Sequence, residues 1–171
     1  DTDGFERVTE DVREVLQDVR KDIACDKPIL FTHSMGSFVG RRYIQKYGES
    51  VLKIVLSGTG GPAGLTGSVG KWMAKGFGQV KGLETENHLL NKLTFGKYNA
   101  AFKDYKTDFD WLSSDPDEVQ KYIDDPFCGF VASNQFFVDL ISGLQVVHNK
   151  KEIARIPKNL PILMISGSMD P

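Results

Sequence analysis

The chain has 171 residues, of which 40% are hydrophobic and 26% are charged, a composition typical of one ordinary globular domain. Its formal net charge of -2 excludes the strong positive field that nucleic-acid-binding proteins and proteins drawn to acidic membrane surfaces carry. No apolar run approaches the roughly 18 residues that a membrane-spanning helix needs, so no integral membrane segment is predicted.

The first 60 residues predict alternating helices and buried strands. Apolar residues recur every three or four positions from Phe5 to Ala24, which indicates an amphipathic helix. The short apolar run PILFT, residues 28–32, predicts a buried strand. A second helix is expected over Met35–Tyr47, with Gly48 as its left-handed C-terminal cap. A second buried strand is expected over Val51–Gly58.

The alternation of helices and buried strands ends there, because residues 61–155 contain no strand pattern as strong as the first two. They predict several short helices joined by loops, over Val69–Phe77, Glu86–Leu93, Pro116–Ile123 and Phe136–Val147. The apolar strand pattern returns in LPILMISGSMDP, residues Leu160–Pro171. This order predicts an α/β fold, a parallel sheet with crossover helices and a helical insertion. Since three parallel strands make a thin sheet that needs neighbours and cover on both faces, we expect a piece of a larger fold.

Ser34 lies at the corner where the first strand gives way to a helix, within the sequence THSMG. The nucleophile elbow of α/β-hydrolases has the pattern G-x-S-x-G at such a corner. A strained turn exposes the serine hydroxyl, small residues two before and two after let the strand and helix approach, and the next amide can stabilise an oxyanion. Gly36 matches the second glycine, whereas Thr32 stands where the first is usual and makes the turn more crowded.

The sequence resembles the branch of the α/β-hydrolases that contains monoacylglycerol lipases, lysophospholipases and serine aminopeptidases. The resemblance rests on HSMGS followed by RRYIQKYG, a second strand ending in SGTGG, a long helical insert, and the final PILMISGSMDP. It implies that Ser34 is the nucleophile, that the amide of Met35 is one oxyanion donor, and that Asp170 is the triad acid.

The resemblance also implies a division of the chain. Residues 1–60 would form a partial α/β-hydrolase core with the nucleophile elbow, residues 61–155 a helical cap, and residues 156–171 a core strand that carries the acid. In this family the catalytic histidine follows the acid, yet only Pro171 follows Asp170. We therefore expect the histidine and the second oxyanion donor outside this chain, as in the middle part of a longer hydrolase.

The three histidines, His33, His88 and His148, all precede Asp170, and we interpret them as structural. The predicted cap is rich in aromatic residues, which can line an acyl-chain pocket or build the cap's own core. The pocket interpretation is favoured for the phenylalanines of PFCGFVASNQFF, namely Phe127, Phe130, Phe136 and Phe137.

Other features favour simple structural roles. Cys25 and Cys128 lie far apart without metal-type spacing, which favours reduced thiols and a cytoplasmic location, and Cys128 is interpreted as a buried apolar thiol. The loop Ser57–Gly61 lacks the lysine of a phosphate-binding loop, so we interpret it as a hinge into the cap. Two basic pairs are expected on solvated helix faces, Arg41-Arg42 and Lys150-Lys151.

The predicted function is therefore a serine hydrolase that cleaves carboxylic esters of the monoacylglycerol or lysophospholipid type. The predicted partner is a small-molecule ester or lipid substrate, with no cofactor, metal or nucleic acid, and the oligomeric state stays open. The alternatives are an aminopeptidase-like serine hydrolase, an acyltransferase, a C–C bond hydrolase, or a non-catalytic binding module with the α/β-hydrolase fold.

Overall fold

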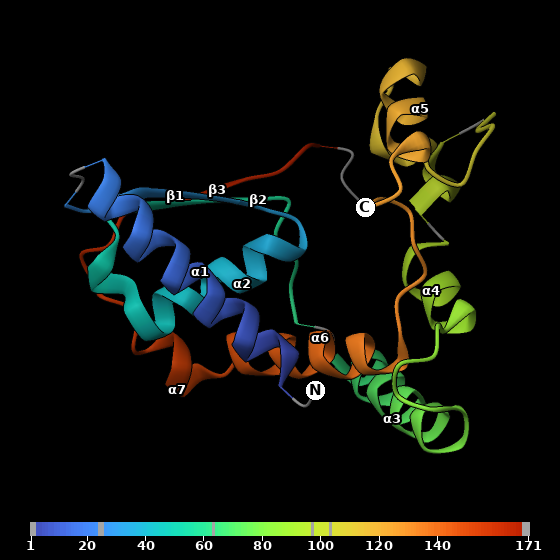
Figure 1. The fold of residues 1–171 in the computed structure, drawn as a ribbon, viewed down its shortest axis with the longest axis horizontal. Coiled ribbons are helices and arrows are strands. Elements are labelled where there is room, and N and C mark those ends of the chain that lie inside the picture. The colour runs from blue at the N-terminus through green and yellow to red at the C-terminus, as the bar shows by residue number, and fades with distance from the viewer. Residues whose placement is uncertain (1–2, 24–25, 63, 97, 103, 169–171) are drawn as a thin grey trace. The chain divides into compact units, whose positions relative to one another are not determined.

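The structure is a computed structural model that describes residues 3–23, 26–62, 64–96, 98–102 and 104–168 (Figure 1). The chain divides into two compact units. Unit 1 runs to Trp72 and resumes at Val138, and unit 2 is Met73–Phe137. Unit 2 thus lies inside the segment 61–155.

Unit 1 contains a three-stranded sheet with the order β1-β2-β3, formed by β1 (Ile29–His33), β2 (Lys53–Ser57) and β3 (Ile162–Ile165). Both pairings are parallel, and their register places Leu30 beside Ile54 and Ile54 beside Ile162. The prediction of a parallel α/β sheet with crossover helices is confirmed.

Helices α1 (Gly4–Asp22) and α2 (Met35–Tyr47) lie together on one face of this sheet (Figure 1). Phe5 of the apolar stripe predicted on α1 is buried, and Val12 and Leu16 pack against the core. The prediction was wrong for the other valines of the stripe, since Val8, Val15 and Val19 are 42–60% exposed. The main core between sheet and helices is apolar, and its fully buried residues are Tyr43, Ile44, Val51, Ile54 and Leu56. The predicted bounds of α2 are confirmed, and its packing fixes the corner at Ser34 against the sheet.

The other face of the sheet is uncovered in the described residues. Ile29 and Phe31 of β1 are 58% and 63% exposed, and Leu163 of β3 is 56% exposed. The prediction that these strands are buried was therefore wrong for this face, because the described helices of unit 1 cover only the other side of the sheet (Figure 1). On the covered side the prediction holds for β2, since Ile54 and Leu56 are 1% exposed. It was wrong for β3, whose paired residues on that side, Ile162 and Met164, are 39% and 64% exposed.

The expected left-handed cap at Gly48 is also wrong. Gly48 has φ -57° and ψ -26°, which is right-handed, and the chain continues into the 3-10 helix η1 (Gly48–Ser50). A Cβ at this position would lie 2.5 Å from Cδ of Pro157. The glycine is thus required by close packing and not by its backbone conformation.

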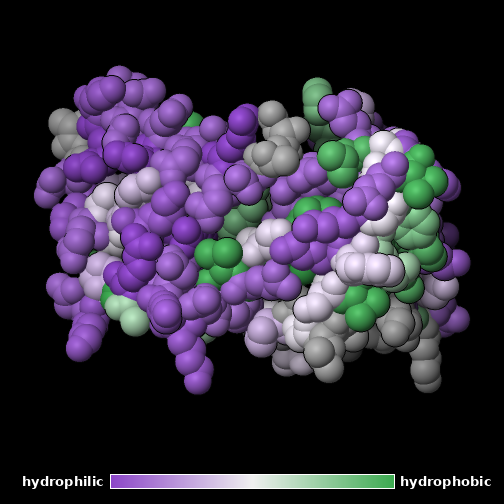
Figure 2. Space-filling view, turned by 90° about the horizontal axis from the view of Figure 1, so that it is seen from below, coloured by the Kyte–Doolittle hydropathy of each residue, from purple (hydrophilic) through white to green (hydrophobic). Residues whose placement is uncertain are grey.

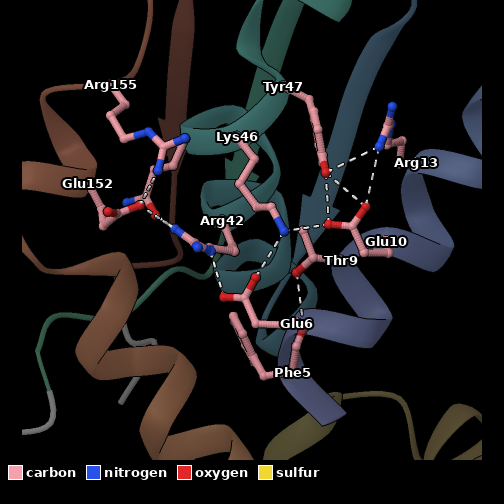
Figure 3. A network of polar contacts seen from close by, with 11 residues as sticks. Phe5, Glu6, Thr9, Glu10, Arg13, Arg42, Lys46, Tyr47, Glu152 and Arg155 are labelled. Carbon is pink, nitrogen blue, oxygen red and sulfur yellow. Dashed lines mark hydrogen bonds and ion pairs between the residues drawn. The ribbon is translucent and has the colours of Figure 1, made fainter. Parts of the chain in front are cut away.

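An ion network joins α1, α2 and the short helix α7 (Lys150–Ile153) (Figure 3). Arg42 of α2 donates to Glu6 of α1 at 2.7 Å and to Glu152 of α7 at 2.5 Å. Lys46 donates to Glu6 at 3.1 Å and also to Glu10.

The prediction that Arg41 and Arg42 lie on a solvated face was wrong. The Arg42 side chain is 11% exposed within the ion network, because two carboxylates on other helices make its burial favourable. Arg41 is partly buried and donates to the carbonyl of Gly60 at 3.0 Å. Lys150 and Lys151 are exposed as expected.

Four further helices lie where the sequence predicted them, with longer or shifted ends: α3 (Gly64–Lys81), α4 (His88–Phe95), α5 (Pro116–Asp124) and α6 (Asn134–Val147). The sequence did not predict helix α7 or the 3-10 helices, which besides η1 are η2 (Tyr98–Ala101) and η3 (Asp110–Leu112). Within unit 2, the buried side chains of Asn87 and Asn134 hydrogen-bond at 2.6 Å and tie the start of α4 to the start of α6.

Candidate active site

Ser34 occupies a strained corner between β1 and α2. Its backbone has φ 49° and ψ -124°, a region that residues other than glycine rarely adopt. Such a conformation costs about 1–3 kcal/mol and persists only where its surroundings fix it. The residue is exposed, so its hydroxyl is accessible. These are the backbone and the exposure that an activated serine at a strand-to-helix elbow requires.

Hydrogen bonds fix the corner from both sides. The N–H of Ser34 donates to the carbonyl of Ser57 at the end of β2, at 2.9 Å. The carbonyl of Ser34 accepts two bonds from Ser37, one from its N–H at 2.9 Å and one from its Oγ at 2.6 Å. The hydroxyl of Ser57 also lies 3.1 Å from Nδ1 of His33.

The close approach of strand and helix depends on Gly40 and not on Gly36. A Cβ at Gly36 would meet no described atom within 4 Å, whereas a Cβ at Gly40 would lie 2.7 Å from Cγ2 of Thr32. Gly40 thus provides the room that the branched side chain of Thr32 takes up. Thr32 in turn donates from Oγ1 to the carbonyl of Val55 on β2, at 3.0 Å.

Met35 is the first residue of α2, so its amide is among those that have no acceptor within the helix. Asp170, the predicted acid, lies outside the described residues. The strand before it, β3, ends with Ile165 beside Ser57, at the same edge of the sheet as Ser34. The N–H of Gly58 donates to the carbonyl of Ile165 at 2.9 Å, which joins the ends of β2 and β3.

The three histidines make contacts other than with Ser34. His33 contacts Ser57, and Nδ1 of His148 lies 2.8 Å from the carbonyl of Leu144 in α6. His88, in unit 2, lies 3.6 Å from the carboxylate of Glu86.

The four predicted pocket phenylalanines all belong to unit 2. Phe127 and Phe130 are 84% and 68% exposed, whereas Phe137 is 2% exposed. Phe136 and Phe137 form an edge-to-face pair with ring centroids 5.5 Å apart. Phe137 is therefore part of the packing of unit 2, and Phe127 and Phe130 have free surface for a ligand.

Within the described ranges, the cysteines and the acidic and histidine side chains give no second candidate site. Cys128 is partly exposed, so the prediction of a buried thiol was wrong. Desolvation, followed by the nearby charge of Asp125 and its hydrogen bond, raises the pKa of the Cys128 thiol, which keeps it protonated and weakly nucleophilic. Cys25 lies outside the described residues. In the part of the chain that the structure describes, no three His, Cys, Asp or Glu side chains gather into a possible metal site. Nor is any helix of that part both long and apolar enough to cross a bilayer.

A surface cavity of about 440 Å³ lies between the C-terminal halves of α1 and α2 and the segment around Pro157. Its lining includes Arg13, Tyr47 and Arg155 and none of the predicted site residues. The cations that line it already contact carboxylates, such as Glu10 for Arg13 and Glu152 for Arg155. It is therefore separate from the corner at Ser34.

Sequence reasoning found the corner but missed two of the residues that support it. Ser37 is an ordinary helix residue in the sequence, and Gly40 lies one turn beyond the motif. The crowding noted at Thr32 was a usable signal, because a larger residue there demands a small one on the facing helix.

A family model described as "Serine aminopeptidase, S33" matches residues 1–171. No curated protein sequence matches the chain significantly.

Three solved structures are similar in fold. A highly thermostable carboxyl esterase from Bacillus coagulans is 23% identical with a TM-score of 0.81, over 93% of this chain and 52% of its own. A monoacylglycerol lipase from Paleococcus ferrophilus is 25% identical with a TM-score of 0.60, over 94% of this chain and 54% of its own. A lipase in an open form is 20% identical with a TM-score of 0.77, over 98% of this chain and 55% of its own. The chain thus spans about half the length of each.

Proposed function

Because the chain belongs to the serine aminopeptidase S33 family and has a partial α/β-hydrolase fold, we propose that it carries the nucleophile of a serine hydrolase that cleaves carboxylic esters. The observation that carries the proposal is the backbone of Ser34, with φ 49° and ψ -124° at an exposed strand-to-helix corner. Core packing does not explain the strain at Ser34, because its side chain is not part of the core. A role as a nucleophile does explain it, since strained backbone is common at active sites.

In the proposed reaction, Oγ of Ser34 attacks the ester carbonyl and gives its proton to a histidine outside residues 1–171. Asp170 orients that histidine, as the family order of serine, acid and histidine implies. The N–H of Met35 and a second amide outside the chain donate to the oxyanion, and the N-terminus of α2 adds a favourable dipole. The alcohol leaves with the proton, and water then hydrolyses the acyl-serine by the same route.

Monoacylglycerols or lysophospholipids are the proposed substrates. Support comes from the similarity to a monoacylglycerol lipase and from the aromatic residues of the helical insertion, which suit a single acyl chain. We propose that Phe127, Phe130, Phe136 and Phe137 line the pocket for that chain, with Phe127 and Phe130 in direct contact with it.

The test is hydrolysis of p-nitrophenyl esters from acetate to palmitate by the longest natural form of the protein. Ser34→Ala is expected to reduce activity to background, because the nucleophile is lost. Ser50→Ala is the control, since its hydroxyl makes two hydrogen bonds at the far end of α2, to Tyr43 and to the Tyr47 carbonyl. Wild-type activity no higher than that of Ser34→Ala on every ester would refute the proposal, and activity at background in both forms would favour a non-catalytic binding module.

The pocket proposal has its own test. Phe127→Ala and Phe130→Ala should lower kcat/KM for long acyl esters more than for acetate, because they remove only ligand-facing area. Phe137→Ala is less informative, since truncating a side chain that is 2% exposed costs about 3–5 kcal/mol of stability. An unchanged chain-length profile in both exposed variants would count against these residues as pocket lining.

An aminopeptidase is the second candidate, favoured by the description of the matching family model. The same serine, acid and oxyanion donors can cleave an amide, but the pocket must then bind a free ammonium group. Aminoacyl p-nitroanilides discriminate the two: turnover of anilides above esters would favour the peptidase.

A further inference from the structure

The orientation of the proposed oxyanion donor depends on a peptide plane. The carbonyl of Ser34 and the N–H of Met35 belong to one rigid peptide unit, so fixing the carbonyl fixes where the amide points. The plane on the other side of the Ser34 Cα holds the N–H of Ser34, which donates to Ser57 at 2.9 Å. Both planes are thus held, and together they determine φ and ψ of Ser34.

The plane that carries the Met35 amide is held by a side chain. Oγ of Ser37 donates to the Ser34 carbonyl at 2.6 Å, in addition to the Ser37 N–H at 2.9 Å. Ser37 is fully buried, at 0% exposure, so water cannot replace its hydroxyl. Serine hydroxyls in helices often donate to a carbonyl of the preceding turn. Here that carbonyl belongs to the strained residue itself.

We propose that Ser37 is a positioning residue for the reaction: its hydroxyl holds the Ser34–Met35 peptide plane and so aims the Met35 N–H at the developing oxyanion. The inference rests on the proposed function of Ser34. Ser37 does not touch the substrate. Its effect should therefore fall on acylation and on binding of transition-state analogues, and not on binding of the ground state.

The experiment compares Ser37→Ala with Ser142→Ala in the longest natural form of the protein. Ser142 is a matched control, because its Oγ also donates to a carbonyl one turn back, that of Val138 in α6. We expect Ser37→Ala to lower kcat about tenfold with KM unchanged. A tenfold loss is the size expected when the transition state loses the contribution of about one hydrogen bond. Ser142→Ala should keep the wild-type kcat.

Two further readouts separate positioning from a structural role. The labelling rate of Ser34 by a fluorophosphonate should fall by the same factor as kcat. Affinity for an alkyl boronic acid, which forms a tetrahedral adduct with serine, should also fall by that factor. If Ser37→Ala does not fold, Ser37→Cys retains a weak donor and should show a smaller loss in all three quantities.

A kcat and labelling rate within twofold of Ser142→Ala, for either variant, would overturn the proposal. Ser34→Ala separates this failure from failure of the proposed function. If Ser34→Ala abolishes activity and Ser37→Ala behaves like the control, only the role of Ser37 is wrong. If Ser34→Ala keeps activity, both proposals fall.

Discussion

The side chain of Thr32 occupies space that any larger residue at position 40 would need. A Cβ at Gly40 would lie 2.7 Å from Cγ2, 3.0 Å from Oγ1 and 3.2 Å from Cβ of Thr32. The contact at 2.7 Å is shorter than real Cβ atoms make, and the other two are tight. Both residues lie in regular structure, where little can shift. The departure from the glycine pattern at Thr32 is therefore compensated within the same chain.

Gly40→Ala is expected to destabilise the protein by about 1–3 kcal/mol, because the extra methyl overpacks the contact between α2 and β1. Gly36→Ala is the matched control on the same helix, with no described atom within 4 Å of its new Cβ. Urea unfolding followed by circular dichroism measures both. Thr32→Gly should remove most of the cost of Gly40→Ala, and purely additive effects of the two changes would contradict this account.

At the scale of elements, the ion network ties α1 and α7 to α2 (Figure 3). The hydrogen bond from Lys46, then that from Tyr47, lowers the pKa of Glu10 from 4.5, and the hydrogen bond from Arg42 lowers the pKa of Glu152 from 4.5. A carboxylate with a lowered folded-state pKa takes up protons more readily when unfolded. Its stabilisation is thus present above about pH 4.5 and is lost as pH falls through the folded-state pKa values.

Melting temperature measured from pH 7 down to pH 3 tests this account. Wild-type protein should lose stability steeply below about pH 4.5. The double variant Glu10→Gln, Glu152→Gln should melt lower at pH 7 and show a flatter decline. Glu14→Gln, an exposed carboxylate on α1, should leave the profile close to wild type. A double variant with the wild-type slope would show that other groups cause the acid sensitivity.

The sequence predicted the long helices well, since apolar residues that recur over many positions indicate which face of a helix packs inward. The bounds Met35–Tyr47 of α2 agree with the structure to the residue. Helix α7 has four residues and is too short to show a period, so it was missed. The burial of Arg42 was missed because its partners, Glu6 and Glu152, lie 36 and 110 positions away in the sequence.

The local geometry around Ser34 was predictable to a similar degree. The corner at Ser34 follows from a strand and a helix that meet at a serine, which is local information. The bond from Ser37 to the Ser34 carbonyl depends on ψ of Ser34, and the contact of Gly40 with Thr32 depends on how helix and strand cross. Neither can be read from residue types alone.

At the scale of the whole molecule, the two faces of the sheet differ. In Figure 2, seen from the side on which helices cover the sheet, hydrophilic residues dominate the left part of the view, and hydrophobic residues lie among them in the right part. The opposite face of the sheet exposes Ile29, Phe31, Leu163 and Ile165. Among the described strands, β1 and β3 each pair with β2 alone, so each also has an open edge. Apolar faces and open edges of this kind promote association.

Residues 1–171 alone are therefore expected to self-associate at micromolar concentration and to bind an apolar dye such as ANS. A longer natural form should do neither, because further chain can cover the face and edges. Sedimentation velocity and dye fluorescence measure the two properties. Phe31→Lys, which places a charge on the uncovered face, should lower association of the short form. A monomeric short form without dye binding would contradict this expectation.

The connection between the two units has an evolutionary consequence. The chain leaves unit 1 within α3 and returns within α6. Within unit 1, Nζ of Lys71 on α3 donates to Oε1 of Gln145 on α6 at 3.0 Å. The strands on either side, β2 and β3, pair directly with each other. Insertions, deletions or exchange of the segment between the two helices can thus accumulate without changing the register of the sheet. Under the proposed function, such changes would alter the residues proposed to contact the acyl chain, Phe127 and Phe130, and leave the corner at Ser34 in place.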